Sequence, residues 1–331
     1  MKASPAWMVL MVVAVLLAGC GEGGEATAGK SMKCPPEADA EQGGKPPRPK
    51  REVFISVNRY VGAESAGILM AQERGYFADA GLEVTVTDAL TPNGPLSYVL
   101  GEVVDFGVAQ QPEVVMAEKN GAAVIALGTL ASRPTAALIW LRRSKIEEVS
   151  DLEGKTIAYS GIAFQRAFLQ ILLEEAGLTL KDVELLDVGH GIVPALVSGQ
   201  ADAAFGGTAN VEGAVLEGRA LEPVVTPVED LGIPPYNDLV VITRSDRAAP
   251  DARLARAFMS AVARGNAAAV EDPREAVRAI EKNLEGDPNL GRKATEASVE
   301  ATLPLLSPTG CIDLDQEAQL IDWMSEQGLI R

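Results

Sequence analysis

The chain has 331 residues, a length that fits two lobes or two domains better than one small core. It has 29 Lys and Arg against 46 Asp and Glu, and this net charge of −17 argues against binding to nucleic acid or to an anionic membrane surface through charge. The hydrophobic fraction of 47% is that of a globular protein. One histidine and three cysteines leave little room for a protein-built metal site or for Ser-His-Asp catalysis, so we expect no metal site and no catalytic residues.

The N-terminus has the pattern of an export signal. Lys2 precedes an apolar run over residues 7–17, which leads into Leu-Ala-Gly-Cys at residues 17–20. A short basic start, an apolar core of this length and small residues before the cut predict a secretory signal and not a spanning helix. The last four residues resemble a bacterial lipobox, which implies a signal peptide over residues 1–19 and lipidation of Cys20. The alternative is an ordinary signal peptide with an incidental cysteine.

The next segment, residues 20–52, is predicted to be a flexible tether. Residues 21–52 hold six glycines and five prolines with scattered charges, so they bury too little apolar surface to order themselves. Export also favours disulfides, and with Cys20 acylated the remaining pair is Cys34 and Cys311. We predict a structural disulfide between them. The alternative, a reactive or metal-binding pair, has no histidine or basic cluster nearby.

From residue 53 the sequence alternates short β-rich runs with helical ones. The predicted order is strand 53–57, helix 66–74, strand 83–87, helix 95–100, strand 103–108, helix 112–119 and strand 123–127. The same order recurs as strand 156–159, helix 165–176, strand 183–188, helix 193–197 and strand 203–205. Alternation of this kind gives a parallel sheet covered by helices, and its recurrence favours two lobes of one architecture.

Two further apolar runs, residues 137–141 and 239–243, flank the second series and are predicted to carry the chain into and out of it. Helices are predicted at residues 252–269, 273–283, 293–303 and 314–327, packed back on the first lobe. The predicted fold is therefore α/β, with two α/β lobes joined by two crossover strands. Lobe I comprises residues 53–140 and 239–331, and lobe II comprises residues 141–238. A cleft between such lobes favours a ligand and hinge closure around it.

Several segments resemble the ABC-transporter solute-binding proteins of the type II periplasmic-binding-protein fold. The opening of the first lobe, residues 62–84, carries the resemblance, as do Asp-Leu-Glu-Gly-Lys at 151–155 and Gly-Gln-Ala-Asp-Ala at 199–203. Gly-Gly-Thr-Ala-Asn-Val-Glu-Gly at 206–213 and Gly-Ile-Pro-Pro-Tyr at 232–236 are similar to the group that binds thiamine pyrimidine precursors, whose relatives bind riboflavin or alkanesulfonates. That group has two aromatic residues where this chain has Thr208 and Ala209, whereas Asn210, Glu212 and Tyr236 keep its pattern.

Ligands of open α/β lobes lie beyond the carboxyl ends of the strands, and this rule selects the candidate loops. Two of them offer general binding features: Ser160 and Gly161 open a helix whose free amides suit an anion, and His190 lies between two glycines. A carboxylate such as Glu212 could accept hydrogen bonds from the exocyclic amine of an aminopyrimidine. The complete set of predicted ligand contacts is Asn58, Glu64, Asn93, Gln110, Gln111, Ser160, Gly161, His190, Thr208, Asn210, Glu212 and Tyr236.

The resemblance implies the solute-binding component of an importer, which captures a small heterocycle and delivers it to an ABC permease. Such a protein needs no cofactor, and we expect a monomer, lipid-anchored to the cell membrane and facing the outside or the periplasm. A riboflavin or an alkanesulfonate (taurine) receptor is the first alternative. The second is an enzyme, because the same fold includes thiamine-pyrimidine synthases that consume a cofactor and a histidine. The export signal argues against a cytosolic synthase, and the cysteine-rich motif of the eukaryotic synthases is absent.

Overall fold

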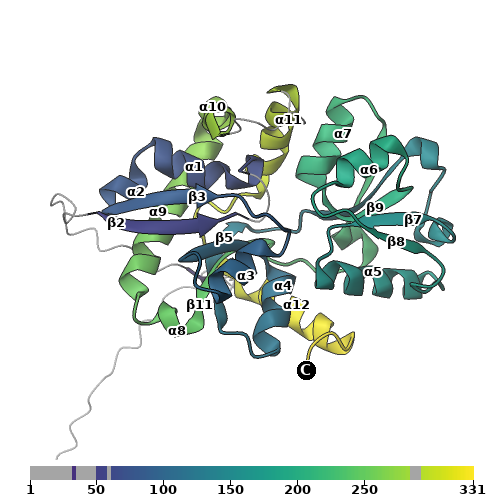
Figure 1. Ribbon diagram of the computed structural model, residues 1–331, viewed down its shortest axis with the longest axis horizontal. Helices are drawn as coiled ribbons and strands as arrows, with labels where there is room; N and C mark the ends of the chain where they lie inside the picture. Colours follow the sequence, from purple (N-terminus) through teal and green to yellow (C-terminus); the bar gives the residue numbers. More distant parts are fainter. Residues whose placement is uncertain (1–31, 35–49, 58–60, 284–291) are drawn as a thin grey trace, which may run out of the picture. The chain divides into compact units, whose positions relative to one another are not determined.

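The computed structural model describes residues 32–34, 50–57, 61–283 and 292–331. The predicted signal peptide, the lipidation site Cys20, most of the predicted tether and Asn58 therefore lie outside the described residues. The described residues belong to one compact unit that spans residues 31–331. Within it the structure has two five-stranded sheets, each covered by helices on both faces, which confirms the predicted two-lobed α/β fold (Figure 1).

The first sheet has the strand order β3-β2-β4-β11-β5 and defines lobe I. Its strands are β2 (Arg51–Ser56), β3 (Leu82–Thr87), β4 (Phe106–Gln110), β5 (Val124–Ala131) and β11 (Leu239–Arg244). The strands β2, β3 and β4 are parallel, whereas β11 is antiparallel to both β4 and β5. The lobe also contains η1 (Ala63–Ser65), α1 (Ala66–Glu73), α2 (Tyr76–Asp79), α3 (Gly94–Leu100), α4 (Gln111–Lys119) and α8 (Ser245–Ala248). The sheet is thus mixed, because the strand that returns from the second lobe inserts between two strands of the first series.

The second sheet has the order β10-β6-β9-β7-β8 and defines lobe II. Its strands are β6 (Ala136–Leu141), β7 (Thr156–Tyr159), β8 (Glu184–Asp187), β9 (Ala203–Thr208) and β10 (Pro223–Pro227). Around them lie η2 (Arg142–Ser144), η3 (Val149–Leu152), α5 (Ala163–Glu175), α6 (Ile192–Ser198), η4 (Ala209–Gly213), α7 (Ala214–Gly218) and η5 (Val228–Leu231). The parallel strands β8, β7 and β9 are neighbours, so the loops that follow them meet at one edge of the sheet.

One lobe boundary differs from the prediction. Strand β6 pairs with β9 and β10 of the second sheet, so the chain enters lobe II before residue 136 and not at residue 141. The return crossing ends at β11, which begins at Leu239 in the first sheet. The two crossings, residues 132–135 and 228–238, are joined by Asp238, whose carboxylate accepts hydrogen bonds from the backbone N–H and the hydroxyl of Thr135. The hinge between the lobes is therefore a pair of hydrogen-bonded segments.

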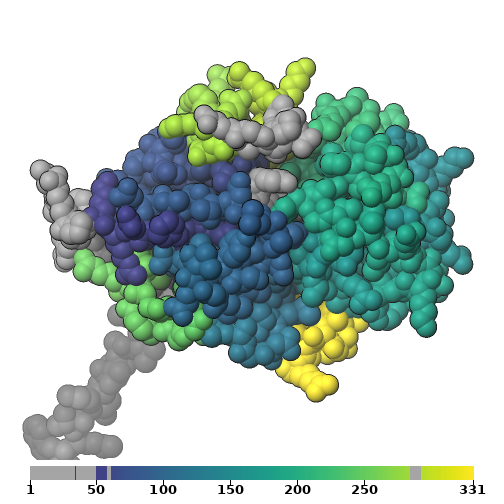
Figure 2. Space-filling view, in the orientation of Figure 1, coloured from purple at the N-terminus to yellow at the C-terminus, as the bar shows by residue number. Residues whose placement is uncertain are grey.

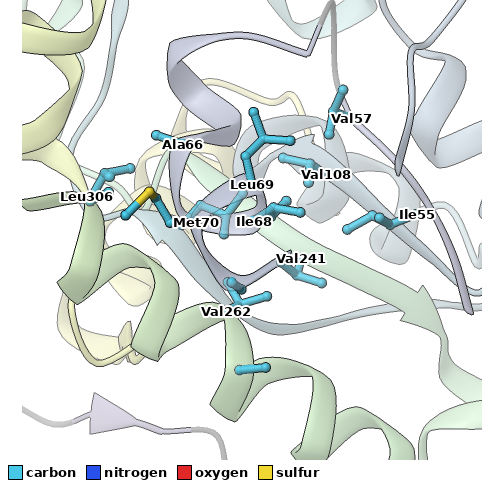
Figure 3. Close-up of a cluster of buried hydrophobic side chains, with 14 of the residues drawn as sticks. Ile55, Val57, Ala66, Ile68, Leu69, Met70, Val108, Val241, Val262 and Leu306 are labelled. Atoms are coloured by element: carbon cyan, nitrogen blue, oxygen red, sulfur yellow. The ribbon is translucent and has the colours of Figure 1, made fainter. Parts of the chain in front are cut away.

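The core of lobe I forms on both faces of its sheet because successive strand residues point in opposite directions. On β11, Val241 lies in the cluster shared with α1 and α9, and Val240 lies with side chains of α3 and α4 on the other face (Figure 3). The helices α1 and α9 pack closely enough that a Cβ atom on Gly265 would lie 2.0 Å from the carbonyl oxygen of Gly67. Glycine at these positions lets the two helices approach and bury the side chains shown in Figure 3.

The C-terminal part of the chain is helical, as predicted. It comprises α9 (Ala252–Glu271), α10 (Pro273–Asn283), α11 (Arg292–Thr302), η6 (Leu303–Leu305) and α12 (Leu314–Glu326). Helices α9 and α10 pack on α1 of lobe I. Helix α12 reaches both lobes: its Leu320 and Met324 share a cluster with Val115 of α4, and Trp323 packs edge-on against Phe168 of α5. Figure 2 shows its yellow atoms beside the teal atoms of lobe II.

Part of the predicted tether is ordered. Strand β1 (Met32–Lys33) pairs antiparallel with β12 (Ile312–Asp313), and next to this pair Cys34 and Cys311 form a disulfide. This confirms the predicted cysteine pairing, which links positions 277 residues apart in the sequence. The N-terminal segment is thereby attached to the short strand that precedes α12.

Candidate functional site

The loops after the parallel strands of lobe II are brought together by Gln165 of α5. Its side-chain oxygen accepts a hydrogen bond from the backbone N–H of Ser160 at 3.0 Å, and its amide nitrogen donates to the carbonyl of Gly206 at 3.3 Å. Gly206 has a φ of +80°, and a Cβ atom there would lie 2.4 Å from the Gln165 carboxamide carbon. Gly161 has a φ of +75° and packs against Asp187, at the end of the neighbouring strand. The predicted residues Ser160, Gly161 and Thr208 therefore belong to one edge of the sheet.

Glu212 lies in η4, a single π-helical turn that continues strand β9. Its Oε2 accepts a hydrogen bond from the backbone N–H of Thr208 at 2.7 Å and from the Thr208 hydroxyl at 2.9 Å. The carboxylate is 4% exposed, so these bonds fix its position in the turn. Single π turns are frequent at functional sites, because the extra residue redirects side chains. The arrangement shows that Glu212 stabilises its own turn.

Asn210 makes one of the contacts between the lobes. It is 3% exposed, and its amide nitrogen donates to the hydroxyl of Thr302, at the end of α11, at 2.9 Å. Helix α11 packs against η4 and α7 of lobe II and also against η1 of lobe I, which contains the buried Glu64. Figure 1 shows α11 beside α7. Through α11, the structure connects the surroundings of Glu64 in lobe I with those of Asn210 and Glu212 in lobe II. We call this α11 interface with η1, η4 and α7 the lobe seam.

Gln110 and Gln111 belong to the hinge. Gln110 donates to Asp238 at 3.5 Å, and Gln111 accepts a hydrogen bond from the backbone N–H of Asn237 at 2.9 Å. Asn237 in turn forms two bonds with the backbone of Asp313 in β12, with donor–acceptor distances of 2.9 Å and 2.8 Å. These buried side chains connect the end of β4, the return crossing and the C-terminal segment.

Three other predicted residues lie apart from the seam. Asn93 is exposed at the N-terminus of α3, and His190 is partly exposed in the loop between β8 and α6. Tyr236 is 0% exposed and belongs to the hydrophobic cluster of lobe II. Burial, with smaller contributions from Asp238 and Glu229, raises the pKa of Tyr236 well above its usual value. Its phenol is thus neutral, and its ring packs in the core of lobe II at the end of the return crossing.

The charges buried in the described part of the chain are all carboxylates. They belong to Glu64, Glu212, Asp238 and Asp313, whereas no described lysine or arginine is buried. A buried anionic ligand needs an opposite charge or several donors to replace its hydration. A ligand that carries hydrogen-bond donors, in contrast, matches carboxylate and amide oxygens. The electrostatics of the described residues therefore favour a neutral or weakly basic solute.

The described residues offer neither a metal site nor a membrane-spanning helix. They contain no group of three or more His, Cys, Asp or Glu side chains placed to hold a metal ion. None of their helices combines the length and apolarity needed to cross a membrane.

Sequence reasoning missed the polar face of α11. Thr295, Ser298 and Thr302 are all buried, and they recur at intervals of three and four residues, which places them on one side of the helix. Small polar residues at these intervals are a sequence signal for a buried polar helix face. The alanines and Val299 beside them give an ordinary amphipathic pattern, so the segment resembles a helix with an apolar buried face.

Comparison with known proteins gives relatives over most of the chain. A formylaminopyrimidine-binding protein of Halalkalibacterium halodurans is 27% identical over 277 residues, which cover 82% of this chain and 84% of that protein. A 4-amino-5-hydroxymethyl-2-methylpyrimidine phosphate synthase of Legionella pneumophila is 26% identical over 271 residues, or 81% of this chain and 84% of the synthase. Both relatives thus match across lobe I and lobe II.

A solved structure shows the same fold. The alkanesulfonate-binding protein from Xanthomonas axonopodis pv. citri has a TM-score of 0.66 and 17% identity, and the match covers 85% of this chain and 94% of that one. At this identity the match supports the periplasmic-binding-protein fold alone. The family described as NMT1/THI5 like matches residues 63–276, a span that contains the two sheets from β3 onward together with Asn210 and Glu212. The chain therefore belongs to the NMT1/THI5-like family.

Proposed function

We propose that this protein is the extracytoplasmic solute-binding component of an ABC importer. It captures a small heterocycle, such as a thiamine pyrimidine precursor, and delivers it to a permease. The lipobox-like sequence around Cys20 supports export and membrane anchoring, and the two-lobed fold with a hydrogen-bonded hinge supports closure around a solute. The formylaminopyrimidine-binding relative, which matches over both lobes, supports the ligand class.

The observation that carries the ligand assignment is the character of the buried polar groups near η4. Asn210 and Glu212 follow β9 on one π turn, and Glu64 is buried in η1, across α11. Carboxylate and amide oxygens accept hydrogen bonds from the exocyclic amine of an aminopyrimidine. No described Lys or Arg is buried to balance a sulfonate, so an aminopyrimidine is favoured over an alkanesulfonate, and riboflavin is the heterocyclic alternative.

Calorimetric titration tests this proposal with formylaminopyrimidine, riboflavin and an alkanesulfonate against wild type, Glu212→Gln and Glu217→Gln. The glutamine at position 212 keeps an oxygen that can accept from Thr208, but it replaces the charged acceptor offered to a ligand amine with a neutral amide. We expect affinity for the aminopyrimidine to fall by about 5- to 150-fold, because the ligand donor loses a charged partner worth about 1–3 kcal/mol. Glu217, exposed on α7, is the matched control and should bind as the wild type does. Tight binding of the sulfonate that Glu212→Gln leaves unchanged would refute the heterocycle assignment.

The synthase relative favours a second candidate, an enzyme that makes the pyrimidine. A synthase of the kind that consumes its own histidine would have to use His190, which is the single histidine of the chain. Mass spectrometry of the intact purified protein and of its peptides distinguishes the two functions. A receptor keeps an unmodified His190 and releases its ligand unchanged, whereas a histidine-consuming synthase leaves a chain of altered mass at that residue.

A further inference from the structure

Helix α11 has one buried polar face at the lobe seam. Thr295, Ser298 and Thr302 are 3%, 2% and 1% exposed, although each carries a hydroxyl. The opposite face holds the exposed side chains Arg292, Lys293, Glu296 and Glu300. The hydroxyl face points toward lobe II, since Thr302 accepts the hydrogen bond from Asn210 of η4. The seam is therefore lined with uncharged polar groups from lobe I.

Two of these hydroxyls have no partner in the described structure. Thr302 uses its hydroxyl twice, as acceptor from Asn210 and as donor to the carbonyl of Ser298 at 2.7 Å. In contrast, Thr295 Oγ1 and Ser298 Oγ are buried without a hydrogen bond among the described residues, and so is Asn210 Oδ1 across the seam. Buried polar atoms are nearly always hydrogen-bonded, and each one left without a partner costs about 1–3 kcal/mol. Two such atoms lie on the helix face from which Thr302 contacts η4, and the third belongs to η4 itself. Together they indicate a partner that arrives from solution.

The chemistry of the cluster defines that partner. A hydroxyl donates one hydrogen bond and can accept two, whereas the Asn210 oxygen only accepts. Glu64 and Glu212 bring negative charge to the same region, and the cations of α11 lie on its exposed face. The site thus suits an uncharged ring that carries both donors and acceptors, and it disfavours a strong anion.

We propose that Thr295 and Ser298 of α11 bind the ligand together with Asn210, so that α11 supplies the lobe I half of a binding site whose lobe II half is η4. This inference rests on the proposed function and extends it to a helix that lies beyond residue 276, where the family match ends. The ligand is a small neutral heterocycle with adjacent donor and acceptor atoms. Binding satisfies the orphaned hydroxyls and thereby joins the two lobes, which makes α11 a determinant of both specificity and closure.

The test measures affinity and stability in the same variants. Thr295→Val and Ser298→Ala remove each hydroxyl with little change of shape, and Thr295→Ser retains it. Because the hydroxyls lack partners in the empty protein, their removal should leave the melting temperature of the empty protein unchanged or raise it. Affinity for formylaminopyrimidine should fall by about 2- to 13-fold for each variant, which corresponds to one hydrogen bond of about 0.5–1.5 kcal/mol. Thr295→Ser should bind within about twofold of the wild type.

Ser325→Ala removes an exposed hydroxyl from α12 and is the matched control, expected to change neither quantity. A purely structural role for α11 predicts the opposite pattern, with a lower melting temperature and unchanged affinity in Thr295→Val and Ser298→Ala. If the wild type binds the pyrimidine and Glu212→Gln weakens that binding, this second pattern overturns the role of α11 and leaves the proposed function standing. A wild type that binds no heterocycle overturns both this inference and the proposed function.

Discussion

Glu113 gives the protein a pH dependence that can be calculated from the structure. It lies in the first turn of α4, two residues after the hinge residue Gln111, and burial raises its pKa from the usual 4.5 to about 8. A difference of about 3.5 pKa units corresponds to about 5 kcal/mol. The positive end of the helix dipole favours the carboxylate by up to about 1 kcal/mol, which leaves about 4 kcal/mol as the upper value. The neutral acid is therefore the form that the folded protein prefers.

The direction in which stability changes with pH follows from proton binding. Between pH 4.5 and about 8 the folded state holds the Glu113 proton and the unfolded state does not, so the free energy of unfolding falls as pH rises through this window. Glu113→Gln mimics the neutral acid at every pH. We expect it to match the wild type near pH 4.5 and to exceed it by as much as about 4 kcal/mol at pH 9.

Urea unfolding at a series of pH values, followed by tryptophan fluorescence, measures the difference between the two proteins. Other titrating groups cancel in that difference, because both chains contain them. Glu217→Gln, at an exposed position, is the control and should give a difference near zero throughout. If the difference between the wild type and Glu113→Gln does not vary with pH, the account of Glu113 as a buried neutral acid is wrong.

Three further predictions concern the hinge and the N-terminal segment. Asn237→Ala removes two hydrogen bonds to the backbone of Asp313, so urea unfolding should show a loss of about 1–3 kcal/mol. An unchanged free energy of unfolding would contradict the hinge network. Thiol titration of the unreduced protein should find Cys34 and Cys311 unreactive, and two reactive thiols would contradict the bond. Reduction of the bond should lower the free energy of unfolding by at most about 5–6 kcal/mol for a loop of this length. Cys20→Ala should move the protein out of the membrane fraction, and unchanged partition would exclude lipidation of that residue.

Much of the fold could be predicted because the relevant signals are local. The helix over 112–119 was bounded by Pro112 and by Asn120-Gly121, and the structure places α4 at Gln111–Lys119. The strand over 137–141 was predicted correctly, but the sequence does not show that it belongs to the second sheet. An apolar run shows that a strand is buried and does not show which neighbour it pairs with. The pairing of β6 with β9 is a long-range contact, and it moved the lobe boundary.

The site was predictable only in part, for a similar reason. Asn210 and Glu212 follow a strand in a motif with fixed spacing, so their common location could be inferred. Tyr236 belongs to an equally clear motif, yet it lies in the core, because a motif does not specify the direction of a side chain. The hydroxyls of Thr295 and Ser298 could be recognised as candidate ligand contacts only from the structure, which packs α11 against η4. The local sequence around such residues does not show which distant segment they contact.

If Cys20 carries a lipid, as the proposed function requires, the disulfide at Cys34 also limits how far the body can travel from that lipid. Fourteen residues separate the two cysteines, so a chain held at both ends spans at most about 50 Å. Because the volume that a tethered body explores grows with the cube of this radius, a tether this short would hold the body close to the membrane. Oxidation of this cysteine pair would thus help to keep the body within that distance of the membrane.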